Sequence, residues 1–79
     1  MDTYIEVKIK KIDGKIVRIR LARSATIDEL KCHIAQKIGY RVQEQRLLYD
    51  GRSLEKGNLE DYEIEDGDRI QLILRLNGC

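Results

Sequence analysis

Apolar and polar residues alternate in two stretches near the start of the chain, residues 4–11 and 16–21. This period of two, carried by many β-branched side chains, predicts two strands that are each buried on one face. Asp13-Gly14 separates them and favours a tight turn, because glycine adopts positive φ without strain. The sequence therefore predicts an antiparallel hairpin. The inward positions are Ile5, Val7 and Ile9 in the first strand and Val17, Ile19 and Leu21 in the second.

After the hairpin the apolar period changes to that of a helix. Thr26 and Glu29 have the spacing of a capping box. In this motif the threonine side chain accepts a hydrogen bond from the backbone N–H three residues on, and the glutamate side chain accepts one from the threonine backbone N–H. Gly39 stands where a helix commonly ends in a left-handed residue. We expect a helix of about 12 residues with one apolar stripe, which must pack on a sheet. The stripe consists of Ile27, Leu30, Ile34 and Ile38.

The second half of the chain predicts two more strands joined by an irregular segment. Residues 45–49 form a short apolar run before the turn signal Asp50-Gly51, and residues 69–76 alternate as a long last strand. Irregular apolar spacing in residues 54–64 indicates a loop with a helical turn, followed by a turn at Asp66-Gly67. The helix gives the crossover that lets the first and last strands pair in parallel. The order predicts an α+β domain with one helix on one face of a mixed sheet.

Composition limits how this domain is stabilised and what chemistry it carries. With two cysteines, Cys32 and Cys79, and one histidine, His33, the chain offers no disulfide framework and too few Cys and His ligands for a zinc site. Hydrophobic packing must therefore hold the fold. Cys32 and His33 are adjacent, and neighbours on a helix point in different directions, so they form a poor catalytic dyad. We expect a protein that is not an enzyme and needs no cofactor.

Charge and hydropathy narrow the expected partners. The 15 Lys and Arg residues nearly balance the 14 Asp and Glu residues, and the formal net charge of +1 gives no general attraction to nucleic acid. No apolar run approaches the roughly 18 residues that a membrane span needs. Residues 1–4 also lack the charged and apolar blocks of a signal peptide. We expect an intracellular protein, cytoplasmic or nuclear, that binds neither nucleic acid nor membrane.

The ordered set of these short patterns resembles ubiquitin from about Tyr4 to the last residue. The resemblance implies the β-grasp fold, a mixed four- to five-stranded sheet with one α-helix packed on one face. It implies a single ubiquitin-like domain over residues 1–79. The strongest matches are Thr26-Ile27 with Lys31 and Ile34, Gln45-Arg46-Leu47-Leu48-Tyr49-Asp50-Gly51, Leu54-Glu55, Asp61-Tyr62, and Leu72-Ile73-Leu74-Arg75-Leu76-Asn77-Gly78-Cys79.

The resemblance also implies a recognition surface. In ubiquitin an apolar patch of a Leu, an Ile, a His and a Val receives most binding domains, and the matching positions here are Ile12, Leu48, Gln71 and Ile73, with Gly51 beside them. Strand alternation agrees, because Leu48 and Ile73 fall opposite the inward residues, and clustered exposed aliphatics mark binding sites. Scattered surface aliphatics are also common without any function. Gln71 replaces the histidine, so we expect no contacts that depend on an imidazole.

Charged residues around this surface match further features of ubiquitin. Arg46 and Arg75 match arginines that meet its activating enzyme, and an acidic partner would gain association rate and orientation from them. The same charges also serve solubility. Arg52 and Asp66 stand at the positions of the two best-known chain-linking lysines and cannot accept an isopeptide bond. Lysines at other matching positions are Lys10, Lys15 and Lys37, which are possible linkage sites, and Lys31, which falls near the buried stripe of the helix.

The tail departs from the family pattern. Ubiquitin ends in Arg-Gly-Gly, whereas the conjugation tail here reads Leu76, Asn77, Gly78 and Cys79. Removal of Cys79 would leave Gly78 as the reactive terminus, whereas a retained Cys79 would block conjugation or yield a poorly activated decoy. Cys79 is also consistent with an internal residue of a longer precursor, a disulfide, a lipid attachment, or drift in a domain used only for binding. The residues alone leave these alternatives open.

Two functions follow from the resemblance. The first is a protein modifier or modifier mimic, recognised through its patch and, where conjugated, attached through its tail by an isopeptide bond. The second is a non-covalent docking domain of a larger protein, which binds ubiquitin receptors or the proteasome. Both make ubiquitin-pathway proteins the expected partners, namely activating or conjugating enzymes and ubiquitin-binding receptors. We expect the chain itself to be a monomer.

Overall fold

The computed structural model describes residues 3–74, which form the predicted hairpin, helix and later strands. A two-residue strand after the Asp50-Gly51 turn is an addition that the sequence pattern does not single out. The last strand, expected over residues 69–76, runs to Leu74, and the remaining two residues lie outside the described part. In chain order the elements are β1 (Tyr4–Lys10), β2 (Ile16–Ala22), α1 (Ile27–Ile38), the 3₁₀ helix η1 (Val42–Glu44), β3 (Gln45–Tyr49), β4 (Arg52–Ser53), the 3₁₀ helix η2 (Leu59–Tyr62) and β5 (Arg69–Leu74).

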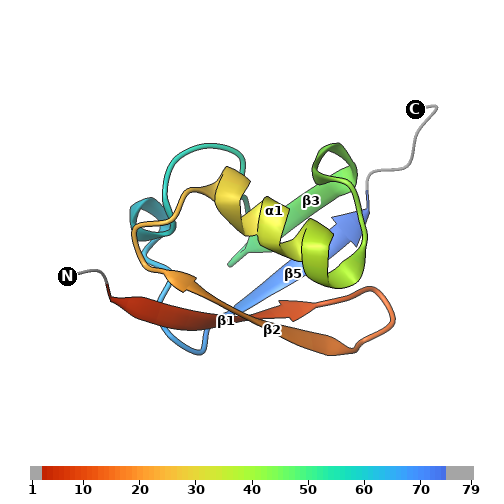
Figure 1. Ribbon diagram of the computed structural model, residues 1–79, viewed down its shortest axis with the longest axis horizontal. Helices are drawn as coiled ribbons and strands as arrows, with labels where there is room; N and C mark the ends of the chain where they lie inside the picture. Colours follow the sequence, from red (N-terminus) through yellow and green to blue (C-terminus); the bar gives the residue numbers. More distant parts are fainter. Residues whose placement is uncertain (1–2, 75–79) are drawn as a thin grey trace.

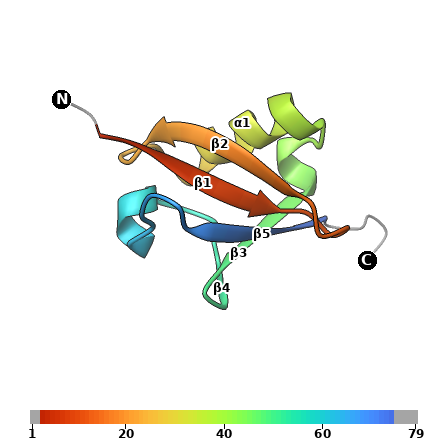
Figure 2. The same cartoon turned by 90° about the horizontal axis from the view of Figure 1, so that it is seen from below.

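The strands form one mixed sheet in the order β2-β1-β5-β3-β4. β1 and β5 are parallel neighbours at its centre, and the other pairings are antiparallel. Figure 1 shows α1 crossing one face of this sheet, and Figure 2 shows the β3–β4 hairpin projecting away from α1. This confirms the α+β arrangement that the alternation and the helical period predict. We call the sheet face opposite α1 the outer face.

Helix α1 begins and ends where its capping residues predict. The Thr26 Oγ1 accepts a hydrogen bond from the Glu29 N–H at 3.1 Å, and Gly39 has a φ of 100° and donates its N–H to the Ala35 carbonyl. The second bond of the expected capping box, from the Thr26 backbone N–H to the Glu29 carboxylate, is absent from the hydrogen bonds of residues 3–74. That carboxylate is exposed, so water competes for it, and it favours the helix N-terminus through its charge alone.

The hydrophobic core lies between α1 and the inner face of the sheet. Three of the four stripe residues of α1 are fully buried, and Ile38 at the helix end is partly buried against them. Residues from the irregular segment that follows β4 close one end, which explains why their spacing has no simple period. The buried hydrophobic residues are Ile5, Val7, Ile9, Ile19, Leu21, Ala25, Ile27, Leu30, Ile34, Leu47, Leu54, Leu59, Ile64, Ile70 and Leu72.

One buried polar side chain, Gln45, ties the first residue of β3 to the helix. Only 4% of Gln45 is exposed. Its Nε2 donates to the carbonyl oxygens of Lys31 and Tyr40, each at 2.9 Å. The alternation of β3 treats Gln45 as one more inward position and gives no sign of these bonds. They depend on two carbonyl groups that only the folded chain brings beside the strand.

A second polar tie links β3 to the loop before β5. The Tyr49 hydroxyl donates to Asp68 Oδ2 at 2.7 Å, and the same oxygen accepts from the Glu65 N–H at 2.8 Å. The hydrogen bond to Asp68, together with burial and the negative charges of Asp68 and Asp50, raises the pKa of Tyr49 to about 12. The folded state therefore favours the neutral phenol.

This tie makes stability depend on pH in the alkaline range. Tyrosine has a pKa of about 10 in an unfolded chain, so the stabilisation by Tyr49 is fully present below about pH 10 and is lost as the pH rises toward 12. We expect Tyr49→Phe to lower the free energy of unfolding by about 1–2 kcal/mol at neutral pH. Urea denaturation at several pH values should show this difference shrinking above about pH 10. A difference that stays constant with pH would contradict the role of the hydroxyl.

Candidate functional site

Two aliphatic side chains lie next to each other on the outer face. In the antiparallel β3–β5 pair, Leu48 is opposite Gln71 and Ile73 is opposite Arg46, so Leu48 and Ile73 are diagonal neighbours. Both are partly exposed. Helix α1 covers only the inner face of the sheet, so it leaves the outer face uncovered (Figures 1 and 2). The two side chains therefore form an apolar centre on a rigid sheet.

Gln71 and Gly51 are the other residues expected on this surface, and we call the four residues Leu48, Gly51, Gln71 and Ile73 the Leu48–Ile73 patch. Gln71 is exposed and follows Leu48 across the sheet. Gly51 lies in the two-residue turn between β3 and β4, where Asp50 has a φ of 51° and Gly51 a φ of 79°. Both positive values are typical of the tight hairpin turn that an Asp-Gly pair favours.

Ile12, which was expected beside these residues, lies in the turn between β1 and β2. Its side chain is 69% exposed. It lines a pocket of about 190 Å³ together with Tyr40, Leu72 and Leu74. The apolar neighbours of Ile12 in that pocket thus come from the end of β5 and from the loop after α1.

The basic residues expected near the patch are only partly free for a partner. Arg46 is exposed opposite Ile73, and Lys10 is exposed opposite Gln71 on β1. Arg52 instead packs within its own domain: its Nη2 donates to the Tyr62 carbonyl at 3.4 Å, and its guanidinium lies 5.6 Å from the centre of the Tyr62 ring. The remaining predicted residues, Arg75, Leu76, Asn77, Gly78 and Cys79, lie outside the described part of the chain.

The candidate linkage lysines differ in their surroundings. Lys10 and Lys15 are exposed on β1 and in the following turn. Lys37, in the last turn of α1, donates its Nζ to the Arg18 carbonyl at 2.9 Å, which ties it to the edge of β2. Lys31 is partly buried, as its nearness to the apolar stripe predicts. Lys37 is exposed as well, so Lys10 and Lys15 are, within residues 3–74, the exposed lysines of the four whose Nζ has no hydrogen-bond partner.

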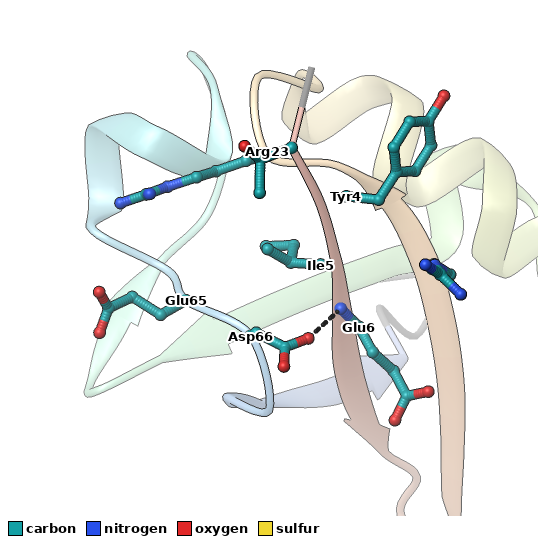
Figure 3. Close-up of a pocket in the computed structure, with 8 residues that line it drawn as sticks. Tyr4, Ile5, Glu6, Arg23, Glu65 and Asp66 are labelled. Carbon is teal, nitrogen blue, oxygen red and sulfur yellow. Dashed lines mark hydrogen bonds between the residues drawn. The ribbon is translucent and has the colours of Figure 1, made fainter. Parts of the chain in front are cut away.

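A mixed-charge groove of about 580 Å³ lies at the beginning of β1 (Figure 3). Asp66, which was considered only as the replacement of a linkage lysine, has a structural role there. Its Oδ1 accepts the Glu6 N–H at 2.7 Å, and the Gly67 N–H donates to the Glu6 carbonyl at 2.7 Å. In Figure 3, Arg23 and Glu65 lie on one side of the groove and Tyr4 points away on the other. The groove is thus built around the tie between β1 and the loop before β5.

Chemical groups for catalysis are sparse in the described part of the chain. Cys32 is an exposed free thiol on α1, and His33 beside it is exposed as well. Residues 3–74 contain no group of three or more His, Cys, Asp or Glu side chains that could hold a metal ion. Within the same residues, no helix is long and apolar enough to cross a membrane. The Leu48–Ile73 patch is the main candidate site because two partly exposed aliphatic side chains lie side by side there, which suits it to binding.

Comparison with known families agrees with the fold. The model of the ubiquitin family matches residues 6–77. The chain belongs to the ubiquitin family. This confirms the family and the β-grasp architecture that the short sequence matches imply.

Relatives of this ubiquitin-family chain differ greatly in length. It is 38% identical over 72 residues to the E3 ubiquitin-protein ligase UHRF2 of Mus musculus, covering 87% of this chain and 9% of the ligase. It is 34% identical over 68 residues to phosphatidylinositol 4-kinase gamma 3 of Arabidopsis thaliana, covering 84% of this chain and 12% of the kinase. It is 29% identical over 73 residues to ubiquitin-like protein 1 of Schizosaccharomyces pombe, covering 91% of this chain and 94% of that protein. The match thus occurs both as a small part of long proteins and as nearly a whole short one.

Proposed function

We propose that this ubiquitin-like domain is a non-covalent docking domain, which ubiquitin-pathway receptors bind through the Leu48–Ile73 patch. Two neighbouring, partly exposed aliphatic side chains, Leu48 and Ile73, carry this proposal. Burying them against a partner releases water from apolar surface, which is the main favourable contribution in protein association. The domain itself performs no chemistry in this function.

The surroundings of the patch support recognition by another protein. Arg46 and Lys10 flank the aliphatic pair, and charges at the rim of an interface set orientation and association rate more than affinity. Hot-spot residues at the centre of an interface are usually surrounded by such polar contacts. The long relatives also support docking, because the matched region is 12% or less of the kinase and of the ligase. An intracellular setting, cytoplasmic or nuclear, follows from this function.

A protein modifier is the second candidate function. It is supported by the Leu74-Arg75-Leu76 sequence before Gly78, which is similar to the end of ubiquitin. A short relative, ubiquitin-like protein 1 of Schizosaccharomyces pombe, matches this chain over 94% of its own length. In this function Lys10 and Lys15 would be the first linkage sites to test, and the outcome depends on Cys79.

The docking function is tested by titrating a helical ubiquitin-binding domain into the isotopically labelled chain. We expect the largest NMR chemical-shift changes at the backbone amides of Leu48, Gly51, Gln71 and Ile73, with Arg46 at the rim. Amides on the exposed side of α1, such as that of Cys32, serve as an internal control and should stay unchanged. Binding that shifts the α1 amides and leaves β3 and β5 unaffected would disprove the assigned surface.

The same protein preparation separates docking from modification. Incubation with a ubiquitin-activating enzyme and ATP should give a reductant-sensitive thioester adduct if the chain is a modifier. A truncated chain that ends at Gly78 controls for obstruction by Cys79. If neither form gives an adduct, the modifier function is excluded while the docking function stands.

A further inference from the structure

A row of three positive charges crosses the outer face beside the Leu48–Ile73 patch, with Arg69 two residues before Gln71 on β5. Lys8 on β1 is the register partner of Arg18 on β2 and of Arg69 on β5. All three alternate with buried residues of the core, so their side chains lie on the outer face. We call Arg18, Lys8 and Arg69 the cationic row.

The cationic row is unfavourable for the isolated domain. Like charges directly opposite each other on neighbouring strands lower the stability of a sheet. Within residues 3–74 the one ion pair joins Arg18 to Glu6, with 3.8 Å between Nε and Oε1 and with both side chains well exposed. A pair of this kind contributes little, and in the described part of the chain it leaves Lys8 and Arg69 without an ionic partner. An anionic partner bound over these three adjacent cations would therefore reduce the repulsion between them.

The shape of the surface supports the same conclusion. The row borders a depression of about 490 Å³, whose lining includes Lys37 of α1 together with Ile16 and Val17 of β2. Lys37 is held there by the bond from its Nζ to the Arg18 carbonyl. Four of the six lining residues are cationic and none is acidic. An anionic group in this depression would face positive charge from several directions.

We propose that the cationic row is a second docking surface, which binds an acidic α-helix of a partner protein. Opposite residues on neighbouring strands have Cβ atoms about 4.5–5.5 Å apart. Side chains at positions i and i+4 of a helix have Cβ atoms about 5–6 Å apart. Carboxylates at i, i+4 and i+8 of a helix lying across the strands therefore match the three cations one to one. Alternate residues of an extended strand are roughly 7 Å apart and fit less well.

A broad polyanion such as a membrane or duplex nucleic acid matches this surface less well. Residues 55–68 contain seven Asp and Glu residues and one Lys, and this segment leads directly into β5. The Lys8 N–H donates to the Asp68 carbonyl at 2.9 Å, so the acidic segment ends beside the cationic row. A wide anionic surface would meet those carboxylates as well as the cations. A single helix is narrow enough to contact the row alone.

The test uses the full chain and a synthetic alanine-based helical peptide with glutamates at i, i+4 and i+8. We expect the double variant Lys8→Glu with Arg69→Glu to bind this peptide at least about tenfold more weakly at low salt. The control is Lys15→Glu with Arg41→Glu, which has the same net charge and changes two exposed cations elsewhere; it should bind within about twofold of the parent. Urea midpoints check folding. The row variant should be no less stable than the parent, because it turns the like-charge pair at positions 8 and 18 into an opposite-charge pair and keeps one like-charge pair, at positions 8 and 69.

Further titrations test whether the patch takes part in peptide binding and whether other anions bind the cationic row more tightly than the peptide does. Leu48→Ala should leave peptide binding unchanged, so the proposal for the cationic row is tested separately from the proposal for the patch. Equal weakening in the row and control variants would overturn the proposal, because net charge alone would then explain binding. Tighter binding of an oligonucleotide or of phosphatidylserine vesicles through Lys8 and Arg69 would also overturn it. Self-association of the chain that the row variant abolishes would assign the row to a second copy instead.

Discussion

Leu48→Ala is expected to weaken binding of a helical ubiquitin-binding domain at least about tenfold. Fully burying a leucine side chain contributes about 1.5–3 kcal/mol, and each 1.4 kcal/mol corresponds to about tenfold in affinity. Leu48 lies at the middle of the patch, opposite Gln71 and diagonal to Ile73, so a partner would cover it fully. Isothermal titration calorimetry on the parent and variant chains measures the difference.

The matched control for this prediction is Ile16→Ala. Ile16 is also an aliphatic residue of the outer face and is 45% exposed, but it lies on β2, at the opposite edge of the sheet from β4. We expect it to change affinity by less than about twofold. Leu48 is only partly buried in the free chain, so the urea midpoint of the Leu48→Ala variant should fall only modestly. Equal losses of affinity at the two positions would show that general outer-face hydrophobicity, and not the patch, drives binding.

Ile34→Ala is expected to lower the free energy of unfolding by about 2–5 kcal/mol. Ile34 lies in the middle of α1, is completely buried, and packs in the core against the sheet. Removing its outer carbons loses transfer free energy and leaves a cavity that the rigid sheet cannot close. Natural domains have about 5–15 kcal/mol of stability in total, so this single change would bring a small chain close to unfolding.

Ile38→Ala provides the comparison within the same stripe. Ile38 is the last residue of α1 and is only partly buried, so less surface is lost and water can fill the space. The expected loss is about 1 kcal/mol. Urea titration followed by far-UV circular dichroism suits a chain without tryptophan. Similar losses of unfolding free energy at Ile34 and Ile38 would contradict the conclusion that α1 packs on the sheet mainly through its middle turns.

Regular elements with one buried face could be predicted from the sequence. Alternation in β1 and β2, the stripe of α1 and the caps at Thr26 and Gly39 all appear at their expected positions. Each depends on residues close together in the chain, so local periodicity is enough. β4 could not be predicted, because two residues carry no period and pair only through the hairpin that Asp50-Gly51 closes.

Polar ties and surface neighbours could not be predicted in the same way. Gln45 bonds carbonyls of Lys31 and Tyr40, and Asp68 bonds Tyr49, 19 positions away in the chain. Ile12 was expected with the patch from resemblance alone, and its position in a turn gives it Leu72, Leu74 and Tyr40 as pocket neighbours. These relations depend on how strands are ordered and how loops cross them.

The sequence by itself determined the α+β order and the inward and outward positions of each predicted strand, because periods of two and 3.6 residues report burial directly. Its ordered set of short segments similar to ubiquitin indicated the family. Only the tertiary structure decided which outward residues meet. Strand order and register bring Leu48 diagonal to Ile73, and they bring Lys8 between Arg18 and Arg69. Register is fixed by pairing between distant segments, so neither the extent of the patch nor the cationic row can be read along a single stretch of chain.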